Sequence, residues 1–99
     1  MNQQLTTKEN LVNQRKVAEQ IIPDYPNPAL ESIRFTNAGH INGSGGWSAN
    51  AVVTIDGKEY QEILGTLVSG GDVFPTIPPG SKPDPVTVIY SDGTSEVLK

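Results

Sequence analysis

Two Asp-Gly pairs, Asp56-Gly57 and Asp92-Gly93, most constrain the fold that this chain of 99 residues can adopt. Each pair lies between short runs rich in Val, Ile, Thr and Tyr. An Asp-Gly pair in that setting is a strong signal for a two-residue hairpin, because a type I′ turn needs positive φ at both central residues. The second half of the chain is therefore predicted to form an antiparallel sheet.

The residues before the first pair alternate as a half-buried strand does. From Trp47 to Ile55 the odd-numbered residues are apolar and most even-numbered ones are polar, so the odd set is expected to face the core. In the preceding segment the apolar residues also have odd numbers; they are Ile33, Phe35 and Ile41. Since antiparallel partners share a face, the connection between the two strands must contain an odd number of residues.

Two connections satisfy this parity. A three-residue loop at 42–44 places Trp47 opposite Gly39, and a bulge at Gly45-Gly46 is the alternative. We favour the loop. Trp47 is then a core or rim residue, and a binding platform beside the glycine-rich segment is the other interpretation.

The turn at Asp56-Gly57 determines how the next strand faces. It pairs Val53 with Tyr60, so Tyr60 joins the core face. Glu59 and Glu62 then point to opposite faces, which disfavours a shared-proton carboxylate pair. Glu62 is two residues after Tyr60 and so falls on the same, core-facing side of the strand. A charged residue does not suit the core, and this mismatch suggests that Glu62 lies near a sheet edge.

A helix is predicted at residues 8–22. Its apolar residues form one stripe and its charged residues lie on the opposite side. Three prolines then end the helix and extend the chain. The stripe consists of Leu11, Val17, Ala18, Ile21 and Ile22.

Residues 72–85 contain five prolines, which cannot donate to a strand ladder, so a long exposed loop is expected there. The strands are then placed within residues 31–98. The sequence thus predicts a single α+β domain, residues 1–99, with one N-terminal helix packed on a four- to five-stranded antiparallel sheet.

Charge and residue counts exclude several functions. The net charge is −4 and no cluster of Lys or Arg exists, so nucleic-acid binding is not expected. The chain has no cysteine and one histidine, so we predict no tightly bound metal and no cofactor. No apolar run is long enough to span a bilayer. The polar start indicates a cytosolic protein or one that has lost a targeting segment.

No arrangement typical of catalysis is evident, and the chain is predicted not to be an enzyme. His40 is expected on a polar face, and a solvated residue is its ordinary interpretation. Loops presented by a rigid scaffold are the usual binding elements. We therefore expect a protein partner to contact Phe74 and Ile77 in the proline-rich loop, with Trp47 and His40 as further candidates.

The order of helix, proline-rich crossing and long strands resembles a known group of proteins. The segment ESIRFTNAGHINGSGGWSANAVVTIDGKEYQEI is similar in layout to small extracytoplasmic lipoproteins of Gram-positive bacteria with a cystatin-like fold. The resemblance covers about residues 8–98. It implies an extracellular, membrane-anchored protein whose lipid anchor lies outside this chain. The cystatin inhibitory motif Q-x-V-x-G is not present, since residues 14–18 read QRKVA, so protease inhibition is not implied.

These observations lead to one expected function and two alternatives. A non-catalytic binding or accessory domain of a cell-surface lipoprotein is the first. A cytosolic or phage-encoded accessory protein of the same fold is the second. A small hydrolase or isomerase ranks last, because such an enzyme needs several polar residues pointing into an apolar cavity.

Overall fold

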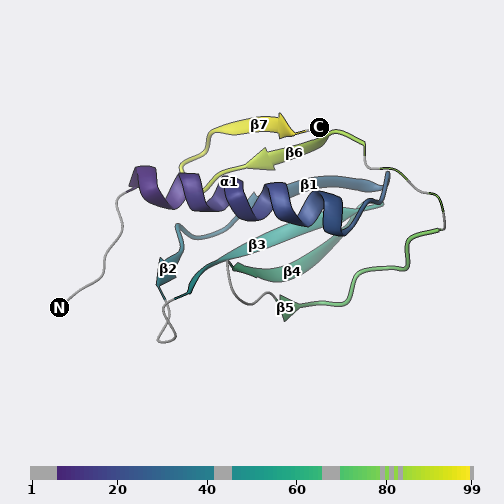
Figure 1. The fold of residues 1–99 in the computed structure, drawn as a ribbon, viewed down its shortest axis with the longest axis horizontal. Coiled ribbons are helices and arrows are strands. Elements are labelled where there is room, and N and C mark those ends of the chain that lie inside the picture. Colours follow the sequence, from purple (N-terminus) through teal and green to yellow (C-terminus); the bar gives the residue numbers. More distant parts are fainter. Residues whose placement is uncertain are drawn as a thin grey trace.

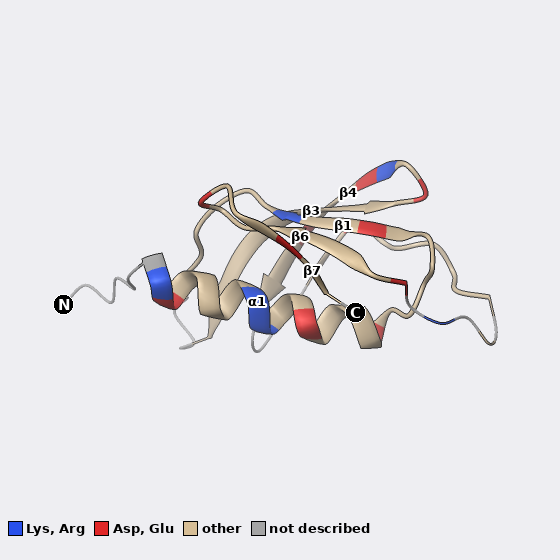
Figure 2. Cartoon of the chain, turned by 90° about the horizontal axis from the view of Figure 1, so that it is seen from above, with Lys and Arg blue, Asp and Glu red and all other residues tan. Residues whose placement is uncertain are grey.

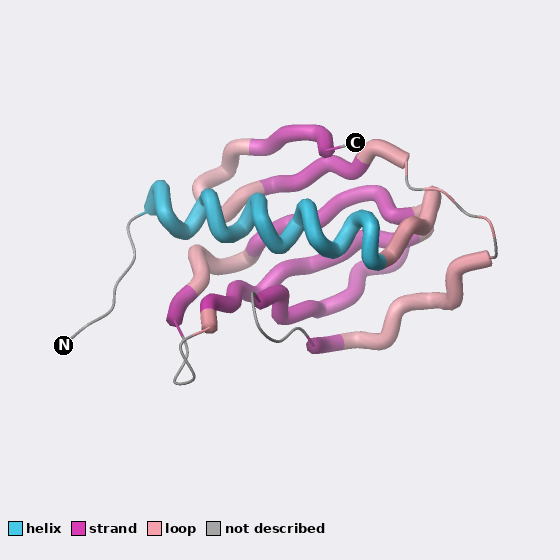
Figure 3. The backbone as a smooth tube through the Cα atoms, in the orientation of Figure 1, coloured by secondary structure: helices cyan, strands magenta, loops and turns pink. Residues whose placement is uncertain are grey.

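The computed structural model describes residues 7–41, 46–65, 70–78, 80, 82 and 84–98. These residues form one helix and a seven-stranded, mostly antiparallel sheet, so the chain belongs to the α+β class (Figure 1). Helix α1, Thr7–Asp24, lies across one face of the sheet (Figure 3). It runs two residues past the predicted end at residue 22, with Pro23 inside its last turn, and the Tyr25 amide still donates to the Ile21 carbonyl (2.8 Å). The strands are β1 (Leu30–Phe35), β2 (His40–Ile41), β3 (Trp47–Ile55), β4 (Lys58–Gly65), β5 (Gly70–Gly71), β6 (Val86–Ile89) and β7 (Ser95–Leu98).

The sheet is larger than predicted. Its strand order is β5-β4-β3-β1-β6-β7, and β2 pairs with β3. The prediction of four to five strands was too low because β2 and β5 have two residues each and are too short for a visible alternation.

The predicted purely antiparallel pairing was also incomplete, since β1 and β6 are parallel. A parallel pair needs a long crossover connection. The described part of the segment between β5 and β6 runs round one end of the sheet, at the right of Figure 3.

The core lies between α1 and the sheet. The helix contributes Val17, Ala18 and Ile22 from the predicted apolar stripe, and these pack with buried residues of the strands. Two buried polar residues share this face of the helix and were not predicted to be buried. Gln14 donates to the Ala38 carbonyl (2.9 Å) and accepts from the Ser91 amide (3.2 Å), and Asn10 accepts a hydrogen bond from the Trp47 indole (3.0 Å).

The first Asp-Gly prediction is confirmed. Asp56 and Gly57 both have positive φ, at 52° and 78°, as a type I′ turn requires. Val53 pairs with Tyr60, as predicted.

The second prediction was wrong in turn type. Gly93 has a φ of 92°, but its amide donates to the Tyr90 carbonyl (3.0 Å), and the Tyr90 amide donates to the Thr94 carbonyl (2.8 Å). The connection is therefore a three-residue loop, Ser91 to Gly93, rather than a two-residue turn.

The connection between β2 and β3 contains an odd number of residues, as predicted, but the two strands pair in a different register. Trp47 pairs with Ile41, not with Gly39, so the favoured arrangement was wrong in its details. The predicted three-residue loop, 42–44, lies outside the described residues. Gly39 still lies against Trp47, since a β-carbon at Gly39 would overlap the indole ring.

Candidate functional site

A pocket of about 380 Å³ lies between the C-terminal half of α1 and the β4–β5 side of the sheet. This volume is within the range of pockets that hold small molecules. Most of its wall is apolar or aromatic. The residues of that wall are Val17, Ile21, Tyr25, Leu64 and Phe74.

The charged groups that line this pocket are all acidic. Asp24 comes from the end of α1, Glu62 from β4, and Asp72 follows β5. Lys and Arg do not occur among the described lining residues. In the described part of the chain they are spread thinly over the molecule (Figure 2). The pocket is therefore an apolar cavity with a negative charge.

Glu62 occupies an unusual position on β4. It pairs with Ala51 of β3, which is 1% exposed and lies in the core beneath α1. Glu62 is therefore on the core-facing side of β4, the side that the sequence also predicted for Tyr60. Its Oε2 atom is buried and has no hydrogen-bond partner among the described residues. On the other side of β4, Glu62 pairs with Gly71 of β5. The sequence-based placement near a sheet edge agrees with this, because β5 is only two residues long.

The surroundings of Glu62 raise its pKa from an ordinary value of 4.5 to about 7. Burial is the largest cause, because it disfavours the charged form, and the negative charge of Asp72 adds to it. The backbone amide of Asp72 opposes both effects. Close to neutral pH, Glu62 therefore exists in both protonation states, unlike an ordinary surface glutamate.

Asp72 is held in place by the backbone of β4. Its Oδ2 atom accepts a hydrogen bond from the Gln61 amide (2.9 Å), and its own amide donates to the Gln61 carbonyl (3.0 Å). These two bonds continue the β4–β5 pairing by one residue. They fix a carboxylate at the mouth of the pocket, next to Glu62.

An aromatic cluster forms the other side of the pocket. The Phe74 ring lies 4.9 Å from the Tyr25 ring and 5.7 Å from the Tyr60 ring, measured between centroids. The Tyr25 hydroxyl donates to the Pro75 carbonyl (2.6 Å) and accepts from the Asn27 side chain (2.9 Å). The start of the proline-rich segment is therefore attached to the end of α1.

The residues predicted as a binding site are not brought together. Phe74 lines the pocket, and Ile77 is half-buried further along the same segment. His40 is exposed on β2, at the left of the sheet in Figure 1, whereas the proline-rich segment runs round the right-hand end. Trp47 is 3% exposed and donates to Asn10, so it lies in the core and offers no platform at the surface.

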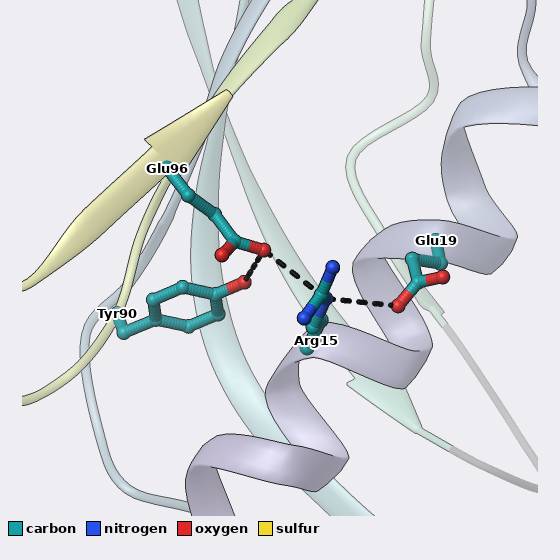
Figure 4. A network of polar contacts seen from close by, with 4 residues as sticks. All are labelled: Arg15, Glu19, Tyr90 and Glu96. Atoms are coloured by element: carbon teal, nitrogen blue, oxygen red, sulfur yellow. Dashed lines mark hydrogen bonds and ion pairs between the residues drawn. The ribbon is translucent and has the colours of Figure 1, made fainter. Parts of the chain in front are cut away.

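A second polar cluster joins α1 to the last hairpin. Figure 4 shows Arg15 between Glu19 of the helix (3.2 Å) and Glu96 of β7 (3.1 Å). Glu96 also accepts a hydrogen bond from the Tyr90 hydroxyl (2.8 Å). Burial and this bond to a carboxylate raise the pKa of Tyr90 well above its usual range. Since both ion pairs are largely exposed, we interpret the cluster as a weak structural tie.

Sequence reasoning did not identify Asp24, Tyr25, Glu62 and Asp72 as one site. The only available signal was that Glu62, a charged residue, lies on the predicted core face of its strand. The other three residues belong to the end of a helix and to the flanks of β5, where no periodic pattern exists.

No protein-family model matches this chain, and the comparisons with curated proteins and with solved structures likewise give no match. The described residues contain no helix that is long and apolar enough to cross a membrane. Among those residues, no group of three or more His, Cys, Asp or Glu side chains is arranged to hold a metal ion. The fold and the site thus define a small α+β domain with an acidic, apolar-walled pocket.

Proposed function

We propose that this protein is a non-catalytic binding domain that captures a small molecule in the pocket beside Glu62. The observation that carries this proposal is the pocket itself, about 380 Å³ with apolar and aromatic walls and few polar groups. Small-molecule sites have this composition, because apolar walls supply affinity and a few polar groups supply orientation.

The test is a screen of small organic fragments by protein-observed NMR. We expect bound fragments to shift the amide signals of Ile21, Gly70 and Gly71, which surround the pocket. Ile21→Trp should fill the pocket and abolish these shifts. Val12→Trp is the matched control, because Val12 lies on the same helix and is 48% exposed. Shifts that survive Ile21→Trp would place the binding site elsewhere.

We further propose that the domain serves a cell-surface lipoprotein with a cystatin-like layout. A single helix on one face of a mostly antiparallel sheet supports the layout, whereas the parallel β1–β6 pair departs from a plain meander. A cytosolic or phage-encoded accessory protein is the alternative. Antibody detection in cell-surface and cytosolic fractions of the source organism distinguishes them, and an exclusively cytosolic signal would contradict the lipoprotein assignment.

A protein partner at the proline-rich segment remains part of this proposal. The contacts of Phe74 with Tyr25 and Tyr60 support it, because a segment held at its start loses less conformational entropy on binding. Replacing residues 75–83 with a Gly-Ser turn should leave the domain folded and abolish partner capture. Capture that survives in the folded variant would make the segment a connector.

A proton-transfer enzyme is the second candidate, and Glu62 favours it. A carboxyl group in a pocket with a pKa of about 7 is suited to accept and return a proton at neutral pH. Any bound fragment with an acidic carbon–hydrogen bond should then exchange that hydrogen in D₂O, and Glu62→Gln should stop the exchange without stopping binding. Bound fragments that show no exchange would leave binding as the function.

A further inference from the structure

The pocket contains negative charges without positive partners. The described ion pairs of Arg15 and Arg34 involve Glu19, Glu96 and Glu59, which lie outside the pocket. Within the described part of the chain, the three carboxyl groups that line the pocket make no ion pair. A buried or half-buried carboxylate is costly unless a positive charge or hydrogen-bond donors compensate it. Glu62 is the half-buried carboxyl group of the pocket; its Oε2 atom has no hydrogen-bond partner among the described residues, and no described Lys or Arg lines the pocket to compensate it.

We propose that the pocket binds a small organic cation, with its ammonium group beside Glu62 and Asp72 and its apolar body against Ile21, Tyr25 and Phe74. This inference rests on the binding function proposed above and names the class of ligand.

The aromatic wall supports a cation in the same position. Tyr25 and Phe74 line the pocket together with the three carboxyl groups, and the two rings are tilted by 51° to each other. Aromatic faces attract ammonium ions through their negative quadrupole, and this attraction grows when water is excluded. An aromatic wall with carboxylates beside it therefore favours a cation over a neutral ligand or an anion.

The size and the ligand chemistry favour an organic cation over a bare metal ion. The cavity of about 380 Å³ is far larger than a metal ion needs. The described residues include no group of three carboxylate or histidine side chains arranged as metal ligands. An alkyl- or arylammonium ion fills the apolar volume and brings up to three N–H donors to the carboxylates.

Cation binding must also change the protonation of Glu62. The titratable groups that line the cavity with it are Asp24 and Tyr25 at the end of α1 and Asp72 after β5, and no described cation lines it. A bound ammonium ion favours the ionised carboxylate, so Glu62 releases its proton when the ligand binds. Affinity should therefore increase as the pH rises from 6 to 8.

The experiment uses a panel of alkyl- and arylammonium ions, each paired with the alcohol of the same skeleton. Affinities are measured by NMR titration of the pocket amides. We expect the best ammonium ion to bind about tenfold more tightly than its alcohol, which corresponds to about 1.4 kcal/mol. Glu62→Gln should remove most of this difference and its pH dependence. Glu59→Gln should change neither, because Glu59 lies on the same strand and is exposed.

The outcomes separate the two proposals. Alcohols that bind as tightly as the ammonium ions would overturn the cation assignment and leave the binding pocket intact. A panel in which no member shifts the pocket amides would overturn both proposals. If Glu62→Gln does not fold, Asp72→Asn removes the neighbouring negative charge and keeps an oxygen that can accept from the Gln61 amide, and an unchanged preference for the ammonium ion in that variant would contradict the proposal.

Discussion

Glu62 lies directly opposite Gly71 across the β4–β5 pair, and a β-carbon at position 71 would stand 2.7 Å from the Glu62 Oε2 atom. Gly71 also has a φ of +137°, which residues with a side chain rarely adopt. The absence of a side chain at Gly71 is thus what lets the Glu62 carboxyl group fit beneath β5. Gly71 therefore makes room for the carboxyl group whose pKa is raised to about 7.

This relationship predicts a sharp difference between two neighbouring glycines. Gly71→Ala should destabilise the fold by roughly 1–3 kcal/mol, because it combines backbone strain with overlap at β4. Gly70→Ala is the matched control, since nothing lies within 4 Å of a β-carbon there. Urea unfolding of both variants measures the difference. Equal midpoints for the two variants would show that β5 does not pack on Glu62.

The raised pKa of Glu62 predicts how stability depends on pH. Between pH 4.5 and about 7 the folded protein keeps the Glu62 proton, whereas the unfolded chain loses it, so stability falls as the pH rises through this window. Glu62→Gln removes this loss. Allowing for solvent at this half-exposed group, we expect the variant to gain about 1 kcal/mol relative to the wild type between pH 5 and pH 8.

Urea unfolding of the wild type and of Glu62→Gln across that pH range measures the effect. Glu59→Gln is the control, because Glu59 is exposed on the same strand. Parallel stability curves for the wild type and Glu62→Gln would contradict a pKa near neutrality.

The close packing at Ala51 predicts sensitivity to added volume. Ala51 is 1% exposed in the core beneath α1, between β1 and β4. Ala51→Leu should overpack this contact and lower the free energy of unfolding by roughly 1–3 kcal/mol. Ala38→Leu is the control, because Ala38 is exposed. An unchanged thermal midpoint for Ala51→Leu would mean that the helix does not lie close to β3 at this position.

The hydrogen bond from Trp47 to Asn10 predicts a specific coupling between α1 and β3. Asn10→Ala removes the acceptor of the buried indole N–H, so we expect a loss of about 1–2 kcal/mol. In a Trp47→Phe background the same change should cost less, because no indole N–H remains to be satisfied. A double-mutant cycle by chemical denaturation measures the coupling, and a coupling of zero would remove this bond as a determinant of the helix position.

Part of the fold could be predicted because its signals are local. The turn at Asp56-Gly57 depends on the φ values of two adjacent residues, and the apolar stripe of α1 depends on spacing within four residues. The burial of Gln14 and Asn10 could not be predicted in this way. Each is polar, and each is buried only because a partner far along the chain satisfies it.

The sequence by itself determined the helix, the five longer strands and the first hairpin, because period and turn chemistry act over a few residues. Only the tertiary structure decided the parallel pairing of β1 with β6, which depends on where a long connection brings the chain back. It also decided the pocket, since Asp24, Glu62 and Asp72 come from three separate elements. Their electrostatic environment arises from burial and mutual proximity, and neither property exists until the sheet and the helix have packed together.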